Sequence, residues 1–446
     1  MSSRQHLYSR RKAMQLMAMT TAGIATPPLL SGCSVNPVTG EKQLMLMSES
    51  QELALDRKHA PQQFSNDYGS IQNKALNHYI AEVGGAMAST THRPKVPYNY
   101  RAVNATHVNA YTFPAGSMAI TRGILLEMEN ESELAGLLGH ELGHVNARHA
   151  AQRQTRSLFT KLALAGAGMA SSHYNKTAGM LVSSLGGIAS KALLASYSRD
   201  DERQADALGM QYMARSGHNP EGMVGLMELL SEKSKHKPNA LETMFSTHPM
   251  SRARMATAKR RFTNSYRTHG DAPLHRTRYM DHTASVRAQR QTIELIQKAD
   301  EALGKKQVKT AERYLRSALK KDEDDYTALL KMAKVQLAKG NKQDAKHFAD
   351  LAKQAYPQEA QALHVAAIVN LTQGNPAAAR SDLQAYEQRL PGNPQTLFLH
   401  AQALDDMNQK RSASRYYLDY LRTTRQGAYA QHAQQRLLQW GVLKPR

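Results

Sequence analysis

Apolar residues recur every three or four positions along most of the chain, which places them on one face of an α-helix. Such a pattern runs from Ser48 toward Arg57 and again over residues 71–87. It returns from Glu131 onward, where the apolar positions are Leu134, Leu137, Leu138 and Leu142. We therefore expect a mainly helical protein.

One segment departs from the helical spacing and predicts β-structure. Residues 108–113 read Val-Asn-Ala-Tyr-Thr-Phe, and after a Pro-Ala-Gly turn residues 118–121 read Met-Ala-Ile-Thr. Runs of β-branched, aromatic and small residues on both sides of a Pro- and Gly-containing turn are typical of strands. A hairpin or an edge strand is expected here.

The last third of the chain repeats with a period of 34 residues. Two columns of small residues carry the repeat: Ala299, Ala333, Ala367 and Ala401, and twelve residues further on Ala311, Ala345, Ala379 and Ala413. This period, with small residues where paired helices approach each other, is the signature of tetratricopeptide repeats. We expect four repeats over residues 292–425 and a closing helix over 431–440.

Two further stretches lack a clear amphipathic pattern. Residues 162–170 and 178–195 are rich in small apolar residues, but neither reaches the ~18 uninterrupted apolar residues of a membrane span. Buried or lid-forming helices are favoured over membrane spans. A lid that touches a membrane is the alternative. Residues 252–290 are strongly basic and poor in periodic apolar residues, which predicts a connector with a solvated basic surface.

Composition and charge narrow the class of protein. The 446 residues are 41% hydrophobic and 21% charged, which allows a packed core and argues against general disorder. The formal net charge of +21 would suit a nucleic-acid binder, because basic side chains release counterions from phosphates. The N-terminus argues against that partner.

The first 33 residues have the layout of a bacterial export signal that ends in a lipobox. A basic start is followed by a weakly apolar stretch over 13–30 and by Leu30-Ser31-Gly32-Cys33. After removal of residues 1–32, Cys33 is expected to carry a lipid, and the serine that follows it predicts sorting to the outer membrane. A chance cysteine is the less favoured alternative. We expect a periplasmic protein without a disulfide, since Cys33 is the only cysteine, and without a nucleic-acid partner.

The sequence His140-Glu141-Leu142-Gly143-His144 lies on the helix predicted from Glu131. Two imidazoles four residues apart project from one helix face, about 6 Å apart, and suit two corners of a zinc tetrahedron. We predict His140 and His144 as metal ligands. Glu141 is the predicted general base, which takes a proton from a water at the metal and returns it to the leaving amine. Histidines that merely line a helix are the less favoured alternative.

A catalytic zinc needs a third protein ligand and one open position. Residues 197–209 predict a helix on which Glu202 and Asp206 share a face. Glu202 is the predicted third ligand, and Asp206 either holds a ligand imidazole by a hydrogen bond or donates a proton during turnover. The alternative is a solvated acidic helix start. Together these residues predict one Zn²⁺ per chain.

This order of motifs resembles the gluzincin family that includes HtpX and the CAAX prenyl proteases. The shared features are HELGH, Glu-x-x-x-Asp from Glu202, and Ser-Thr-His-Pro at 246–249 with Arg254 six residues after the histidine. The resemblance implies a zinc endopeptidase in which His248 is a fourth ligand that keeps the enzyme latent until it is displaced. It also implies that Asn109 and Ala110, in the strand 109–113, pair with the substrate backbone.

The expected architecture is α+β, mainly α. Residues 33–270 are predicted to form a gluzincin zinc metalloprotease domain with a small edge-strand sheet, 271–290 a basic connector, and 291–446 an α-solenoid of tetratricopeptide repeats.

Relatives of this kind that carry such repeats imply a role in the quality control and assembly of outer-membrane β-barrel proteins. Misfolded or stalled outer-membrane proteins are then the clients, and the barrel-assembly machinery is a partner. The alternative is a tetratricopeptide chaperone or scaffold with little or no proteolysis, because the concave faces of such arrays bind extended or helical segments.

Overall fold

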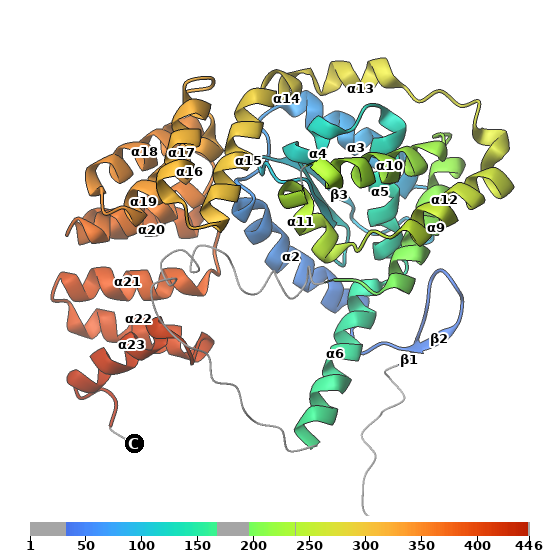
Figure 1. The fold of residues 1–446 in the computed structure, drawn as a ribbon. Helices are drawn as coiled ribbons and strands as arrows, with labels where there is room; N and C mark the ends of the chain where they lie inside the picture. The colour runs from blue at the N-terminus through green and yellow to red at the C-terminus, as the bar shows by residue number, and fades with distance from the viewer. Residues whose placement is uncertain (1–32, 167–195, 237, 445–446) are drawn as a thin grey trace, which may run out of the picture.

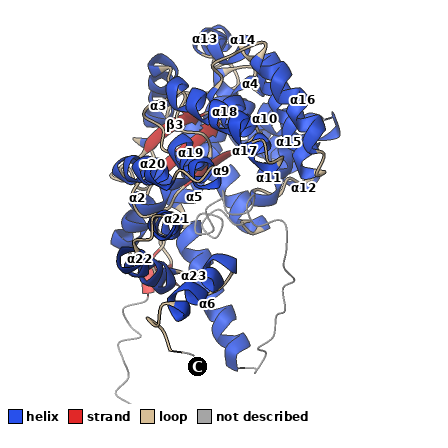
Figure 2. Cartoon of the chain, turned by 90° about the vertical axis from the view of Figure 1, so that its left-hand side faces the viewer, coloured by secondary structure: helices blue, strands red, loops and turns tan. Residues whose placement is uncertain are grey.

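The computed structural model describes residues 33–166, 196–236 and 238–444. Within these ranges the chain is mainly helical, with two small sheets (Figure 2), and the predicted α+β class is confirmed. A domain that contains both sheets precedes an array of helix pairs (Figure 1). The predicted export signal and most of the two small-residue stretches lie outside the described residues. In the part of the chain that is described, no helix has both the length and the apolar character needed to cross a membrane.

The sheets lie near the N-terminus of the described chain. A hairpin comes first, formed by β1 (Cys33–Val35) and β2 (Lys42–Leu44). The second sheet has the order β3-β5-β4, with β3 (Asn99–Val103) parallel and β4 (Ala110–Thr112) antiparallel to β5 (Ser117–Thr121). The predicted hairpin over 108–121 is therefore confirmed, and β4 is an edge strand. The sequence pattern missed β3, a strand of five residues whose partner β5 is distant in sequence.

Helices α2, α3, α4 and α5 make the main contacts with this sheet, and they belong to a set of eight described helices before residue 252 (Figure 1). Their bounds are α2 (Glu49–Asn66), α3 (Lys74–Ala88), α4 (Arg122–Glu127), α5 (Glu131–Asn146), α6 (His149–Gly166), α9 (Arg199–Arg215), α10 (Glu221–His236) and α11 (Pro238–Thr247). Helix α5 begins at the predicted residue because the side chain of Asn130 accepts a hydrogen bond from the backbone N–H of Glu133 at 2.9 Å.

Close packing of α5 against α9 positions the predicted site. Every residue of α5 is buried. A Cβ atom on Gly143 would lie 2.7 Å from the carbonyl oxygen of Ala205, so only glycine lets the two helices approach this closely. The glycine inside the HELGH sequence therefore brings the helix that carries Glu202 against the helix that carries the two histidines.

The segment 252–290 differs from the expected connector. It is largely helical, with α12 (Arg252–Arg261), a π-helical turn (Phe262–Tyr266), a 3₁₀ turn (Arg267–His269), α13 (Arg276–His282) and α14 (Ala284–Ala288). Arg254, Tyr279 and Val286 are buried, and the Tyr279 hydroxyl donates to the carbonyl of Leu125 at 2.7 Å. Each short helix is held by one or two buried side chains, which leaves no apolar periodicity to detect.

The repeat array confirms the predicted tetratricopeptide organisation. Four helix pairs and a closing helix follow α14: α15 (Arg290–Gly304) with α16 (Val308–Leu319), α17 (Tyr326–Ala338) with α18 (Lys342–Ala355), α19 (Gln361–Thr372) with α20 (Pro376–Arg389), α21 (Pro394–Asp406) with α22 (Lys410–Thr423), and α23 (Ala428–Gln439). All eight alanines of the two predicted columns have no exposed surface. These positions are where the paired helices touch.

The first repeats are docked on the sheet-containing domain. Arg122, at the start of α4, makes two hydrogen bonds of 2.6 and 3.1 Å with the carboxylate of Asp325, the N-cap of α17. Both side chains are buried, so the pair is a specific contact between the two domains. Gln297 of α15 also donates to the carbonyl of Thr106 at 2.6 Å.

Candidate metal centre

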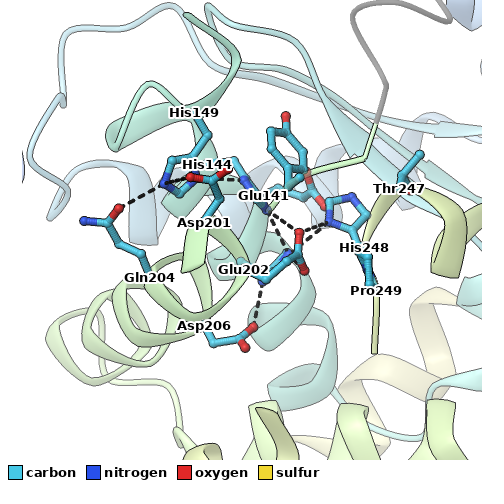
Figure 3. A network of polar contacts seen from close by, with 12 residues as sticks. Glu141, His144, His149, Asp201, Glu202, Gln204, Asp206, Thr247, His248 and Pro249 are labelled. Atoms are coloured by element: carbon cyan, nitrogen blue, oxygen red, sulfur yellow. Dashed lines mark hydrogen bonds and ion pairs between the residues drawn. The ribbon is translucent and has the colours of Figure 1, made fainter. Parts of the chain in front are cut away.

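Four side chains from three separate parts of the chain converge on one point. His140 and His144 come from α5, Glu202 from α9, and His248 from the residue that follows α11 (Figure 3). One ligand atom from each lies within 4.8 Å of the others, and all four residues are buried. The three residues predicted as metal ligands and the predicted fourth one thus form a single cluster.

The distances within this cluster fit a tetrahedral ion. The Nε2 atom of His140 lies 3.1 Å from Nε2 of His144 and 3.3 Å from Nδ1 of His248. Oε1 of Glu202 lies 3.4 Å from Nε2 of His144 and 3.0 Å from Nδ1 of His248. Bonds of about 2.0–2.1 Å to a tetrahedral zinc would set ligand atoms about 3.3–3.4 Å apart.

Hydrogen bonds on the outer side of the rings fix which nitrogens face the cluster. Nδ1 of His140 is 2.9 Å from Oδ1 of Asp206, and Nδ1 of His144 is 2.9 Å from Nδ1 of His149. A proton on Nδ1 of His140 leaves its Nε2 as a lone pair that points at the Nε2 of His144. Two nitrogen lone pairs that face each other at 3.1 Å in a buried site repel, and a cation between them removes this repulsion.

Two of the clustered groups have charge states that suit a cation, whereas for His140 burial is outweighed by the hydrogen bond to Asp206 and the nearby charge of Glu202, which raise its pKa. Burial lowers the pKa of His144 well below its ordinary value and keeps the ring neutral. Burial alone would raise the pKa of Glu202, but His140 and the hydrogen bonds from His144 and His248 lower it, so the carboxylate is ionised. Two imidazole nitrogens with a third imidazole and a carboxylate are a donor set typical of Zn²⁺.

Asp206 holds His140 rather than reaching the centre. Its carboxylate accepts hydrogen bonds of 2.9 and 2.7 Å from Arg254, whose Nη1 also lies 2.5 Å from Oε2 of Glu202. Although burial opposes it, the bonds from His140 and Arg254 lower the pKa of Asp206. An ionised carboxylate on the far side of His140 is suited to orient that ring, and a catalytic role of Asp206 as a proton donor stays a prediction.

Glu141 faces the centre from α5. Glu141 is only 2% exposed, and its Oε1 is 3.7 Å from Nε2 of His248. Its Oε2 has no hydrogen-bond partner among the described residues. Burial raises the pKa of this carboxyl. A buried carboxylate with a free oxygen beside the ligand cluster can accept a proton from a water held there.

Three residues that support the site were missed as functional residues by the sequence analysis. Nε2 of His149 lies 3.0 Å from Oε1 of Gln204 in α9, which completes a chain of hydrogen bonds to His144 (Figure 3). The ring of Tyr197 stacks on His144, with centroids 3.8 Å apart. The contacts made by Gln204 and Tyr197 join residues far apart in sequence. Among the three residues, only His149, five residues after His144, could have been inferred from its position in the sequence.

The predicted substrate strand begins beside α11, the helix that precedes His248. Asn109 and Ala110 are buried at the edge strand β4, and the N–H of Val108 donates to the carbonyl of Ala240 in α11 at 2.8 Å. Helix α11 therefore lies next to the start of this edge and ends one residue before His248. Backbone pairing of a substrate with Asn109 and Ala110 stays a prediction.

Replacement of His149 by alanine is expected to weaken zinc binding by about 10- to 100-fold, because His144 loses the partner that fixes its ring. A competition titration with a chromophoric chelator measures the affinity. His347→Ala, at an exposed position of α18, is the matched control and should bind zinc as the parent protein does. An unchanged affinity in His149→Ala would show that the bond between the two rings does not support the site.

Comparison with known proteins adds two findings. Residues 74–262 match the model of peptidase family M48, and residues 302–368 match a tetratricopeptide repeat model. The chain is 27% identical to the β-barrel assembly-enhancing protease of Yersinia pestis over 263 residues. This match covers 56% of this chain and 51% of the relative. It is 26% identical over 251 residues to the protein of that name from Escherichia coli (strain K12), at 55% and 51% coverage.

A shorter protein is also similar. Metalloprotease YcaL of Escherichia coli (strain K12) is 29% identical over 209 residues, which cover 47% of this chain and 78% of YcaL. The chain spans about half the length of the β-barrel assembly-enhancing proteases that it matches.

Proposed function

Since residues 74–262 match the model of peptidase family M48 and residues 302–368 match a tetratricopeptide repeat model, we propose that this chain is a zinc-dependent endopeptidase of the bacterial periplasm. The observation that carries the proposal is the convergence of His140, His144 and Glu202 on one buried point, with Glu141 beside it. A zinc ion bound there supplies Lewis acidity and lowers the pKa of a water.

The protein groups then have separate tasks. Glu141 accepts a proton from the attacking water and delivers it to the leaving amine. Asp206 and Arg254 hold His140 and Glu202 in place, and the edge strand β4 at Asn109 and Ala110 aligns the substrate backbone by strand addition. The buried site excludes bulk water and strengthens these electrostatic contacts.

His248 gives this site a second state. A fourth protein ligand leaves no open position for water, so the arrangement in which His248 joins the cluster is latent. Activity then requires His248 to move away. The residue follows the end of α11, where a change of a few backbone angles can displace one ring without disturbing α5 or α9.

The substrate class follows from the relatives. Proteins named β-barrel assembly-enhancing protease match 55–56% of this chain. We propose that misfolded or stalled outer-membrane proteins are the clients, that the repeats contact the barrel-assembly machinery, and that a lipid at Cys33 anchors the chain to the outer membrane. A scaffold without proteolysis is the second candidate, and the presence of His248 in the ligand cluster is the observation that favours it.

Metal removal tests the proposed activity. The purified protein is expected to contain one zinc per chain by elemental analysis and to cleave an unfolded protein such as casein. Treatment with 1,10-phenanthroline should abolish the cleavage, and added zinc should restore it. A protein that holds no zinc after purification in zinc-containing buffer, or whose cleavage survives chelation, would refute the proposed function.

A further inference from the structure

The β1–β2 hairpin turns a polar face toward the protein and a largely apolar face outward. The register pairs Val35 with Lys42 and Cys33 with Leu44, which places Val35, Lys42 and Leu44 on one face and Ser34 and Gln43 on the other. The face with Ser34 and Gln43 is turned to the protein. Ser34 accepts a hydrogen bond from Arg148 at 3.1 Å, and Nε2 of Gln43 is buried.

The opposite face is apolar and exposed. Val35 is 54% exposed, Leu44 45% and Leu46 43%. These are half of the six large apolar side chains that are strongly exposed in the described part of the chain, and they lie within twelve residues of one another. A hairpin in contact with water on one side normally presents polar side chains there. Val35, Leu44 and Leu46 are named the apolar face below.

A groove extends the apolar face along the protease domain. It has a volume of about 570 Å³ and lies between α2 and the start of α6, with Leu46, Met47 and Leu55 among its lining residues. The backbone N–H of Leu46 donates to Thr155 of α6 at 3.1 Å. Figure 1 draws the hairpin and α6 at the same lower end of the protease domain.

The hairpin is attached to the protease domain through Arg148, which donates to the hydroxyl of Ser34 and, at 2.8 Å, to the carbonyl of Met47. Asn36 is 4% exposed, its Oδ1 accepts the N–H of Val38 at 2.8 Å, and its carbonyl accepts the N–H of Gly40 at 2.9 Å. Gly40 has φ +72°, which this turn requires. These bonds fix the shape of the turn, and a rotation that brought the apolar face inward would break the contact between Arg148 and Ser34.

We propose that the apolar face rests on the surface of a phospholipid bilayer. Its location points to this partner, because strand β1 begins at Cys33 itself and the chain outside the structure, residues 1–32, ends there. Cys33 pairs with Leu44 in the backbone register, so a lipid on Cys33 would be attached to the hairpin with no linker between them. The exposed Lys42 on the same face and Lys58 at the groove complement anionic headgroups.

The hairpin contact then adds to the anchor. A lipid on Cys33 would hold the chain at the bilayer, and a second contact through apolar and basic side chains strengthens the attachment. Contact through a rigid hairpin also sets the orientation of the protease domain on the membrane. The inference rests on the proposed anchor at Cys33 for the way in which the bilayer is reached, but it requires no proteolysis.

Vesicle binding tests the proposal without the anchor. The processed chain with Cys33→Ser is sedimented with vesicles of phosphatidylethanolamine and phosphatidylglycerol, and compared with the same chain carrying Val35→Ser, Leu44→Ser and Leu46→Ser. The triple variant is expected to bind at least about tenfold more weakly. Leu274→Ser, Leu438→Ser and Val442→Ser together change three equally exposed apolar residues elsewhere and should leave binding unchanged.

Several outcomes would overturn the proposal. The first is that the triple variant binds vesicles as well as its parent. The second is that the triple variant and the control lose binding equally. The third is that high salt completely removes the binding of both the parent and the triple variant. Self-association of the parent that the triple variant loses in the absence of vesicles would assign the apolar face to a second copy of the chain. Casein cleavage by the same samples separates a failure of this inference from a failure of the proposed protease activity.

Discussion

Glu141→Gln is expected to reduce peptide-bond hydrolysis by about 100- to 10,000-fold and to leave zinc binding intact. The amide has nearly the shape of the carboxylate but cannot accept a proton from water. Glu141 is not one of the four clustered ligands, so its replacement leaves the donor set complete. Initial rates of casein cleavage and the zinc content of the same sample measure the two effects.

The matched control is Glu242→Gln, at an exposed position of α11. It makes the same chemical change away from the centre and should retain both activity and zinc. Substantial cleavage by zinc-loaded Glu141→Gln would remove the assignment of the general base. Loss of zinc together with activity would instead give Glu141 a role in holding the metal.

The parts of the fold that were predictable from sequence are those encoded locally. Two histidines four residues apart must share a helix face, and a capped start at Asn130 fixes that helix. The period of 34 residues was equally direct, because each repeat buries the same two alanine positions against its own neighbour. Local periodicity was therefore enough for α5 and for the array.

Glu202 was placed in the site by the helical spacing to Asp206 and by the order of the motifs, and His248 by the resemblance alone. The physical reason that they meet lies in α5 and α9, which approach closely at Gly143. No spacing in the sequence encodes the distance between two helices. The structure was needed to show that both residues face the same point as His140.

Apart from His149, which contacts His144 five residues before it, the residues that sequence analysis did not recognise act through contacts over long distances along the chain. Arg254 was noted only as part of a motif, yet it holds Asp206 and Glu202 at once. Tyr197 and Gln204 support His144 from the loop before α9 and from α9 itself. The short helices over 252–290 escaped detection for the same reason, since single buried side chains rather than a periodic face hold them in place.

His248→Ala is expected to raise the rate of casein cleavage by about tenfold or more. In the cluster, Nδ1 of His248 lies 3.0 Å from Glu202 and 3.3 Å from His140, where a fourth ligand would occupy the position that water needs. If only a minor fraction of molecules has this position open, removal of the ring makes the whole population competent. The assay is run at saturating zinc, because a site with one ligand fewer binds the ion more weakly.

His78→Ala provides the control, since this histidine lies on the surface of α3 and its side chain is 77% exposed. The double variant Glu141→Gln with His248→Ala should be inactive, which ties any gain to the same centre. Unchanged or lower activity of zinc-loaded His248→Ala would refute latency. Hydrolysis also requires that a substrate reach β4, and α11 lies next to the segment that enters this strand, where the N–H of Val108 donates to the carbonyl of Ala240. If neither His248→Ala nor the parent cleaves casein although zinc is bound, an open position at the metal is not sufficient for hydrolysis, and the result favours a scaffold in which the repeats carry the function.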